Sequence, residues 1–273
     1  MKKIFAISDI HGHYHLTIDT LQRAGYDENN ENHLLIVCGD IFDRGCESLE
    51  VFEWLLPLTK SGKAVVLRGN HDYFLMDFLK GSNNPFNFIH NGLRYTLDSF
   101  LESTNDFGMY VLTHTEADNN GVHNPTYRTY IEWAEKCRAS ILEEYPTLLP
   151  WLESFPDYYE TENYIFTHGS IDTNSEDWRE PKKTWYDCHW DDGSFFNKTI
   201  LNTDKTIVVG HFGVYHLRDI YNIKDGASSR YDILKRDDGR VIAIDTTTIL
   251  SKRVNVLVID GEKLKGVMLN ENL

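Results

Sequence analysis

Short apolar runs separated by helix-like segments place the strongest constraint on the fold of this chain. The runs at residues 4–7, 34–38 and 64–67 are almost entirely apolar, which is typical of strands buried on both faces of a sheet. Between them, residues 17–24 and 48–58 carry apolar side chains at helical spacing. Because strands and helices alternate, we expect parallel pairing with right-handed crossovers and an α/β fold.

Further strands are predicted in the C-terminal half, at residues 164–166, 207–209, 241–244 and 254–259. Since the last two are close in sequence, we expect them to form an antiparallel meander. Residues 83–157 differ, because they are rich in Asn, Glu, Tyr and Trp and contain a helical pattern near 127–144. We interpret this range as a mainly helical insertion in a single domain over residues 1–273, and a separate second domain as the less favoured alternative.

Residues of the kind that bind metal ions follow these apolar runs directly. Carboxylate, imidazole and amide groups, with no thiolate among them, suit hard to borderline divalent ions. The carboxyl ends of parallel strands meet at one edge of a sheet, so the segments should converge. One such piece would be weak evidence, but five in this order predict a two-metal site suited to phosphoryl displacement. The pieces are Asp9-Ile10-His11-Gly12, Gly39-Asp40-Ile41-Phe42-Asp43-Arg44-Gly45, Gly69-Asn70-His71-Asp72, Thr167-His168-Gly169 and Gly210-His211.

This string of motifs resembles the PPP-type calcineurin-like metallophosphoesterases. That group contains serine/threonine protein phosphatases, bacterial and phage lambda-phosphatase-like enzymes and symmetrical diadenosine tetraphosphatases. The resemblance runs from residue 3 to about residue 260 outside the insertion, and Asp43-Arg44-Gly45 is its most specific part. It implies an α/β sandwich of two mixed sheets flanked by helices. It also implies two divalent metal ions, with manganese preferred over iron or zinc.

The resemblance also implies a role for individual residues. Asp40 would bridge the two metals, and a bridging water or hydroxide would be the nucleophile. His71 would protonate the leaving group and Asp43 would orient it, while Arg44 and Asn70 would bind the phosphoryl group. The implied metal ligands are Asp9, His11, Asp40, Asn70, His168 and His211.

Three departures from the family pattern bear on the substrate. Asp72 stands where many protein phosphatases have Glu, as it tends to in the dinucleotide-cleaving relatives. The last motif reads Gly-His211-Phe-Gly rather than Gly-His-Thr. The family's second phosphate-binding arginine is also missing after Trp185, and Arg179 is our substitute for substrate binding, ahead of Arg218 and Arg230.

The charge of the chain limits its partners and its location. Its formal net charge is −15, from 27 Lys and Arg against 42 Asp and Glu, so we expect no nucleic-acid or membrane partner. The four cysteines form no CxxC pair, which favours reduced thiols. The charged start of the chain reaches Asp9 too soon for a signal peptide. We therefore expect a cytoplasmic protein.

The preferred function from the sequence is a serine/threonine protein phosphatase, with a phosphorylated protein as its partner. The first alternative is a hydrolase of dinucleoside polyphosphates, a small phosphorylated substrate, which Asp72 favours. A non-catalytic phosphate-binding protein is a third alternative, but the full ligand set together with His71 argues against it. The aromatic group Trp151, Phe155, Tyr158 and Tyr159 is interpreted as core rather than as a base-stacking surface.

Overall fold

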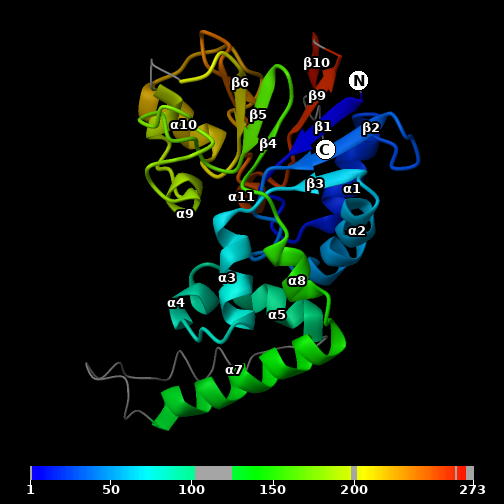
Figure 1. Cartoon of the computed structure of the whole chain (residues 1–273), viewed down its shortest axis with the longest axis vertical. Coiled ribbons are helices and arrows are strands. Elements are labelled where there is room, and N and C mark those ends of the chain that lie inside the picture. The colour runs from blue at the N-terminus through cyan, green and yellow to red at the C-terminus, as the bar shows by residue number, and fades with distance from the viewer. Residues whose placement is uncertain (1, 102–124, 198–201, 262, 269–273) are drawn as a thin grey trace.

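Two five-stranded sheets packed against each other form the centre of the molecule (Figure 1). The computed structural model describes residues 2–101, 125–197, 202–261 and 263–268. Alternate side chains of β1 (Lys3–Ile7) point to opposite faces of the first sheet. Ile4 and Ala6 contribute to the core between the sheets, whereas Phe5 and Ile7 pack toward the helices. This double burial explains why the strands are continuous apolar runs.

The first sheet has the strand order β10-β9-β1-β2-β3. β1, β2 (His33–Val37) and β3 (Ala64–Val66) are parallel, as the sequence predicts, and are joined through the helices α1 (Tyr14–Arg23) and α2 (Ser48–Lys60). β9 (Val256–Asp260) pairs antiparallel with β1, and β10 (Lys263–Met268) pairs antiparallel with β9. The sheet is therefore mixed.

The second sheet has the order β4-β5-β6-β8-β7. β5 (Tyr164–Thr167), β6 (Thr206–Val209) and β8 (Val241–Ala243) are parallel. β4 (Tyr158–Glu160) and β7 (Leu234–Lys235) are antiparallel strands at the two edges. The prediction of a two-sheet α/β sandwich is confirmed.

The expected C-terminal meander is wrong, because β8 belongs to the second sheet and β9 to the first. The connection between them contains the short helix α11 (Thr248–Ser251) and crosses from one sheet to the other. Thr248 Oγ1 donates a hydrogen bond to the backbone oxygen of Asp9, 2.8 Å away, which fixes this crossing beside the end of β1. Two neighbouring apolar runs carry no information about which sheet each one joins.

A helical region lies at one end of the first sheet (Figure 1). It contains α3 (Asn70–Leu79), α4 (Pro85–Ile89), α5 (Leu93–Leu101), α7 (Pro125–Glu144) and α8 (Leu148–Glu153). Phe88, Tyr130 and Trp151 from this region belong to the same buried cluster as Phe5 of β1. This shared core favours the interpretation of residues 83–157 as an insertion. Phe155 is buried there as well, whereas Tyr158 and Tyr159 are half-buried against the other clusters.

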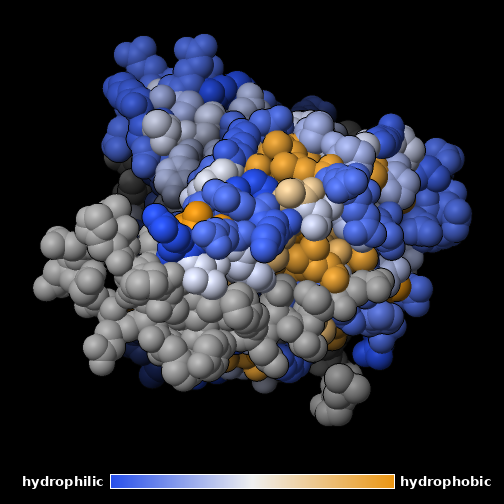
Figure 2. Space-filling view, turned by 90° about the horizontal axis from the view of Figure 1, so that it is seen from below, coloured by the Kyte–Doolittle hydropathy of each residue, from blue (hydrophilic) through white to orange (hydrophobic). Residues whose placement is uncertain are grey.

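The outer face of the second sheet is covered by α9 (Trp185–His189), the 3₁₀ helix η1 (Ser194–Asn197) and α10 (Val214–Tyr221) (Figure 1). Seen from the helical end, the surface is mainly hydrophilic with smaller hydrophobic areas (Figure 2), in keeping with the high charge of the chain. Across the described ranges, every helix is too short or too polar to span a bilayer.

Candidate active site

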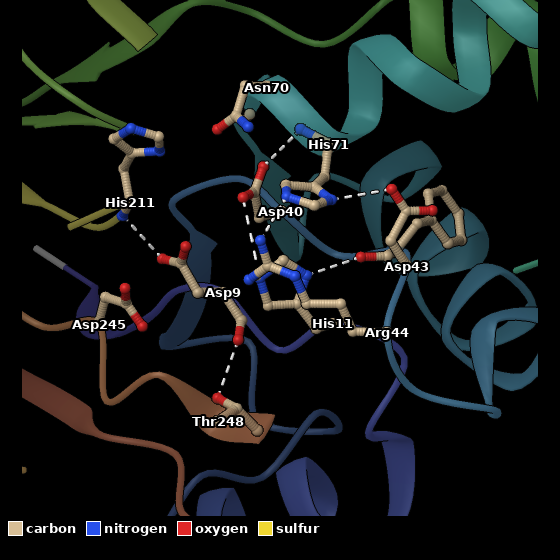
Figure 3. Close-up of polar contacts among 12 residues, drawn as sticks. Asp9, His11, Asp40, Asp43, Arg44, Asn70, His71, His211, Asp245 and Thr248 are labelled. Carbon is tan, nitrogen blue, oxygen red and sulfur yellow. Dashed lines mark hydrogen bonds and ion pairs between the residues drawn. The ribbon is translucent and has the colours of Figure 1, made fainter. Parts of the chain in front are cut away.

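The five predicted motifs converge where the carboxyl ends of the parallel strands of both sheets meet. Figure 3 shows residues of four of them, and His168 of the fifth lies beside Asn70. β1 and β2 of the first sheet lead into Asp9 and Asp40, and α3 begins directly at Asn70 after β3. From the second sheet, His168 follows β5 and His211 follows β6. The site therefore lies between the two sheets, and each sheet supplies part of it.

Backbone strain is concentrated in these motifs. Six of the nine described non-glycine residues with positive φ lie in them, with values from 46° to 69°. This left-handed region is uncommon for residues with a side chain and persists where the surrounding structure imposes it, often at functional sites. The strain turns the ligand-type side chains toward one another; the six residues are Asp9, His11, Asp40, Asp43, Arg44 and His211.

Two glycines are required because the ligands lie so close to the backbone. A Cβ on Gly69 would come within 2.2 Å of Asp40 Oδ1, and one on Gly39 within 2.6 Å of His168 Nδ1. Real Cβ contacts are longer than 3.0 Å, so any side chain here would displace a candidate ligand. These close approaches explain why glycine stands directly before Asp40 and directly before Asn70.

Two groups of side chains have the geometry of metal sites. The first consists of His11, Asp40 and His71, and the second of Asp40, His168 and His211. Within each group the ligand atoms lie within 4.8 Å of one another. Asp40 belongs to both groups, as a bridging carboxylate must.

The remaining two predicted ligands lie beside these groups. Asn70 Oδ1 is 2.9 Å from His168 Nε2. Asp9 Oδ2 accepts a hydrogen bond from the backbone amide of His211, 2.9 Å away. The first group contains His71 rather than Asp9. Asp9 is nevertheless close enough to Asp40 for the Asp40 charge to raise the pKa of Asp9.

Hydrogen bonds to the backbone orient the candidate histidine ligands. His11 Nδ1 donates to the backbone oxygen of Phe42 at 2.8 Å, and His168 Nδ1 donates to that of Cys38 at 2.7 Å. Since a carbonyl oxygen only accepts, each Nε2 keeps a lone pair, as is usual for histidines that bind metal. The Nε2 of His168 faces the Asn70 carbonyl oxygen, and a cation would satisfy both acceptors. His211 Nδ1 is buried without a hydrogen-bond partner.

Burial raises the pKa of the carboxyl groups in the site. The pKa of Asp40 rises to about 7, and the hydrogen bond from the His71 amide and the charge of Arg44 oppose this rise. The pKa of Asp9 is raised well above its usual value by burial, then by Asp245 and Asp40. Burial lowers the pKa of His11, His168 and His211. The imidazoles in the site are therefore neutral, and the carboxylates have too little positive charge around them to stay ionised easily. A bound divalent ion would stabilise the ionised carboxylates and could bind the neutral imidazoles.

His71 has the partners expected of a proton-transferring group. Its Nδ1 lies 2.8 Å from Asp43 Oδ2, and its Nε2 accepts from Arg44 Nη2 at 2.7 Å. The other amino group of the Arg44 fork, Nη1, lies 2.9 Å from His11 Nε2. Asp43 is held in turn by Thr96 of α5, whose Oγ1 donates to Asp43 Oδ1 at 2.9 Å and accepts from the Asp43 amide at 2.8 Å.

Thr96, Asp72 and Asp245 support the site, and none of them is among the site residues predicted from the sequence. Asp72 is buried, and its carboxylate accepts from the backbone amides of Gly69, Asp40 and Ile41. Asp245, also buried, accepts from the Thr247 amide and raises the pKa of Asp9. Asp72 could have been found from its position three residues after a helix-capping glycine, but Thr96 offers no local signal.

The structure does not bring Arg179 to the motifs. Its guanidinium pairs with Glu160 and Asp177. Glu160 is opposite Ile165, near the start of β5, whereas His168 follows the end of that strand. The two alternatives are also held elsewhere, since Arg218 pairs with Asp225 and Arg230 with Asp219. Arg179 is therefore paired with carboxylates in this structure, and its role in substrate binding stays a prediction.

The chain is similar to known proteins in sequence and in structure. A family model described as calcineurin-like phosphoesterase matches residues 2–244. "Bis(5'-nucleosyl)-tetraphosphatase PrpE [asymmetrical]" of Bacillus subtilis is 35% identical over 106 residues, 37% of this chain and 42% of that protein. "Serine/threonine-protein phosphatase 2" of Salmonella typhimurium is 31% identical over 101 residues, 37% of this chain and 43% of that protein. The chain thus aligns with about two fifths of the length of these relatives.

A solved structure shares the fold along nearly the whole chain. It is a serine/threonine phosphatase from Saccharomyces cerevisiae, with a TM-score of 0.52 and 14% sequence identity. The superposition covers 99% of this chain and 77% of that one. At this identity the likeness concerns the fold alone.

Proposed function

The chain belongs to the calcineurin-like phosphoesterase family, and we propose that it hydrolyses phosphate monoesters with two divalent metal ions. The observation that carries this proposal is the pair of ligand groups that share Asp40. Asp9 and Asn70 would complete the ligand set beside His11, Asp40, His168 and His211. When bound, the two ions would activate a water molecule and neutralise charge on the phosphoryl group.

Arg44 and His71 would act on the substrate in a linked way. In this structure the Arg44 fork donates to His71 Nε2, which is therefore unprotonated. An entering phosphoryl group would draw the guanidinium donors to its own oxygens, because a planar fork pairs well with two of them. His71 Nε2, released from Arg44, would then take up a proton from solvent and pass it to the leaving oxygen, while Asp43 holds Nδ1.

We propose phosphoserine or phosphothreonine in proteins as the substrate. Among the described residues, Arg44 is the basic side chain whose hydrogen bonds reach His11 and His71. One arginine suits a single phosphoryl group, and the net charge of −15 disfavours a substrate with several phosphates. A dinucleoside polyphosphate remains the second candidate, because PrpE of Bacillus subtilis is named for that activity.

Manganese is the metal that we propose, with iron or zinc as alternatives, since the donor set contains oxygen and nitrogen but no sulfur. The four cysteines are free in the structure, and three of them are buried. Free thiols fit a reducing compartment, so we propose the cytoplasm as the location.

Turnover by enzyme reconstituted with manganese, iron or zinc tests these assignments. We expect hydrolysis of an aryl phosphate that stops when a chelator is added, and faster turnover of phosphoserine and phosphothreonine peptides than of diadenosine tetraphosphate. Full activity in protein that elemental analysis shows to be metal-free would contradict the two-metal proposal. Preferential cleavage of the dinucleotide would instead establish the second candidate.

A further inference from the structure

We propose that Trp190 and Tyr186 bind an aromatic ring of the substrate on the leaving-group side of the active site. This inference rests on the proposed phosphoesterase function and specifies the substrates of that site. Both side chains belong to α9 or directly follow it, and 41% of Trp190 and 42% of Tyr186 are exposed. Large aromatic side chains are usually more buried, so two adjacent exposed rings call for an explanation.

Trp190 lies beside residues that have proposed roles in the reaction. Its ring centroid lies 5.9 Å from that of His211, a candidate metal ligand, at an interplanar angle of 78°. It also lies 5.7 Å from the ring of Phe74, which is itself 4.9 Å from the ring of His71. Trp190 therefore contacts a candidate metal ligand directly and the proposed proton donor through Phe74.

The side of the phosphate that Trp190 faces follows from the role of His71. A proton donor must stand beside the oxygen that leaves, so the leaving group emerges on the His71 side. Phe74 is one turn after His71 on α3, and Trp190 packs against it. A ring attached to or near the leaving oxygen would thus meet the exposed part of Trp190.

Tyr186 extends the aromatic surface away from the metals. Its ring lies 6.2 Å from Trp190 and 4.9 Å from Tyr73 of α3. These spacings are those of ordinary aromatic pairs, which prefer tilted or edge-to-face geometry. Together the rings form a continuous surface between α9 and α3 that a planar ring of the substrate can stack on.

The Arg68 guanidinium lies 5.5 Å from the ring of Tyr73, whereas acidic residues surround Tyr186 and Trp190 in the sequence. Asp187, Asp191 and Asp192 lie next to them in the sequence. Their carboxylates accept hydrogen bonds from backbone amides of their own loop, and that of Asp187 also accepts from the Thr184 hydroxyl, so these bonds hold them in place. A neutral ring escapes this repulsion, whereas a second phosphate would not.

The shared chemistry of the ligand is a planar ring close to the scissile phosphate. The ring could come from a tyrosyl leaving group, from an aromatic residue next to a phosphoserine, or from a nucleobase. Base–aromatic stacking changes affinity by about 5- to 150-fold. An effect of this size is large enough to set the substrate preference of an enzyme.

The test compares Trp190→Leu with wild-type, manganese-loaded enzyme on matched substrates. The aromatic substrates are a phosphotyrosine peptide, a phosphoserine peptide with a neighbouring Phe, and adenosine 5′-monophosphate. The non-aromatic ones are glycerol phosphate and the same phosphoserine peptide with Ala in place of Phe. Using the ratio of variant to wild type for each substrate removes differences in intrinsic reactivity.

We expect kcat/KM to fall by about 5- to 150-fold for at least one aromatic substrate, mainly through KM, and by less than about twofold for the non-aromatic ones. Trp190→Phe should restore most of the loss. Phe86→Leu is the matched control, because Phe86 is an exposed aromatic residue of α4 that is 58% accessible, and it should change nothing. The substrate with the largest loss identifies the source of the ring.

An equal loss on aromatic and non-aromatic substrates would overturn the proposal and would mean that Trp190 only supports His211. If no substrate is turned over at all, the proposed function fails, and binding still tests the ring site. In that case benzylphosphonate should bind more tightly than methylphosphonate to the wild type but not to Trp190→Leu in titration calorimetry. Equal affinities for the wild type would contradict the aromatic site independently of catalysis.

Discussion

At the scale of single residues, Asp40 links most parts of the candidate site. It belongs to both ligand groups, its carboxylate accepts from the His71 amide at 2.9 Å, and its own amide donates to Asp72. His71 belongs to the first group as well, but its two ring nitrogens are already hydrogen-bonded to Asp43 and Arg44. The two residues should therefore respond differently to substitution.

Replacing each residue by asparagine should separate these roles. His71→Asn should lower kcat by about 10²–10⁴-fold, the usual size of a general-acid effect, and keep its metal. The loss should shrink for activated phenols, whose leaving oxygen needs no proton. Asp40→Asn should reduce metal occupancy, because it removes a charged ligand shared by both groups. The test is to measure the metal content of each variant by elemental analysis together with its kcat. An equal loss of metal in both variants would refute the role given to His71.

The raised pKa of Asp40 makes metal binding depend on pH. Without metal, burial raises this pKa to about 7, so the carboxyl is protonated below that pH and a metal ion must displace the proton. Apparent affinity should then fall by about tenfold per pH unit below 7 and level off above it. Calorimetry at pH 6 in buffers of different ionisation enthalpy should show proton release that is largely gone at pH 8. Identical release at both values would contradict the assignment.

At the scale of elements, α5 is a helix of the proposed insertion that reaches the candidate active site, because its residue Thr96 contacts Asp43. Its residue Thr96 holds Asp43 through two hydrogen bonds, and it is fully buried. In contrast, α7 lies beyond α3, α5 and α8 as seen from the sheets (Figure 1). We therefore expect α5 to contribute to catalysis from behind the proposed proton donor, through Thr96 and Asp43.

Removing the hydroxyl of Thr96 should weaken this arrangement. Thr96→Val keeps the shape of the side chain but leaves a buried carboxylate and a buried amide without their partner. Hydrogen bonds to charged groups contribute about 1.5–3 kcal/mol, so urea unfolding should show a loss of that order together with a lower kcat. Thr96→Ser keeps the hydroxyl and should stay close to the wild type. Equal behaviour of the two variants would show that the hydroxyl has no such function.

The elements also show how far the sequence can be interpreted. Apolar runs predicted the parallel strands, because strands buried on both faces must be apolar, and the motifs after them predicted which residues meet. The partner sheet of residues 254–259 could not be predicted, since β9 joins β1 only through a contact across almost the whole chain. The position of Thr96 follows from helix packing, and the placement of Arg179 from pairing with Glu160, so neither could be read from local patterns.

At the scale of the whole molecule, the candidate metal ligands come from both sheets. Asp9, His11 and Asp40 follow strands of the first sheet, and His168 and His211 follow strands of the second. Buried carboxyl groups in the same place disfavour the folded state when they ionise without a cation nearby. Bound metal should therefore hold the two layers together as well as take part in catalysis.

Metal removal should lower the thermal stability of the protein. A ligand at 100 times its dissociation constant stabilises the folded state by about 2.7 kcal/mol, which corresponds to several degrees in Tm. Scanning calorimetry with manganese and with a chelator should show this shift, and Asp40→Asn should show much less of it. A Tm that does not respond to either addition would contradict a site built across the two sheets.

The contacts of Asp9 also determine when the site can exist during synthesis. Its carboxylate binds the amide of His211, 202 positions later, and its backbone oxygen binds Thr248, 239 positions later. A ribosome adds about 5–20 residues per second, so the N-terminal ligands wait many seconds for their partners. Joining such distant segments also adds loop-closure entropy to the final folding step. The nascent chain therefore carries only part of the candidate site until His211 and Thr248 have been added.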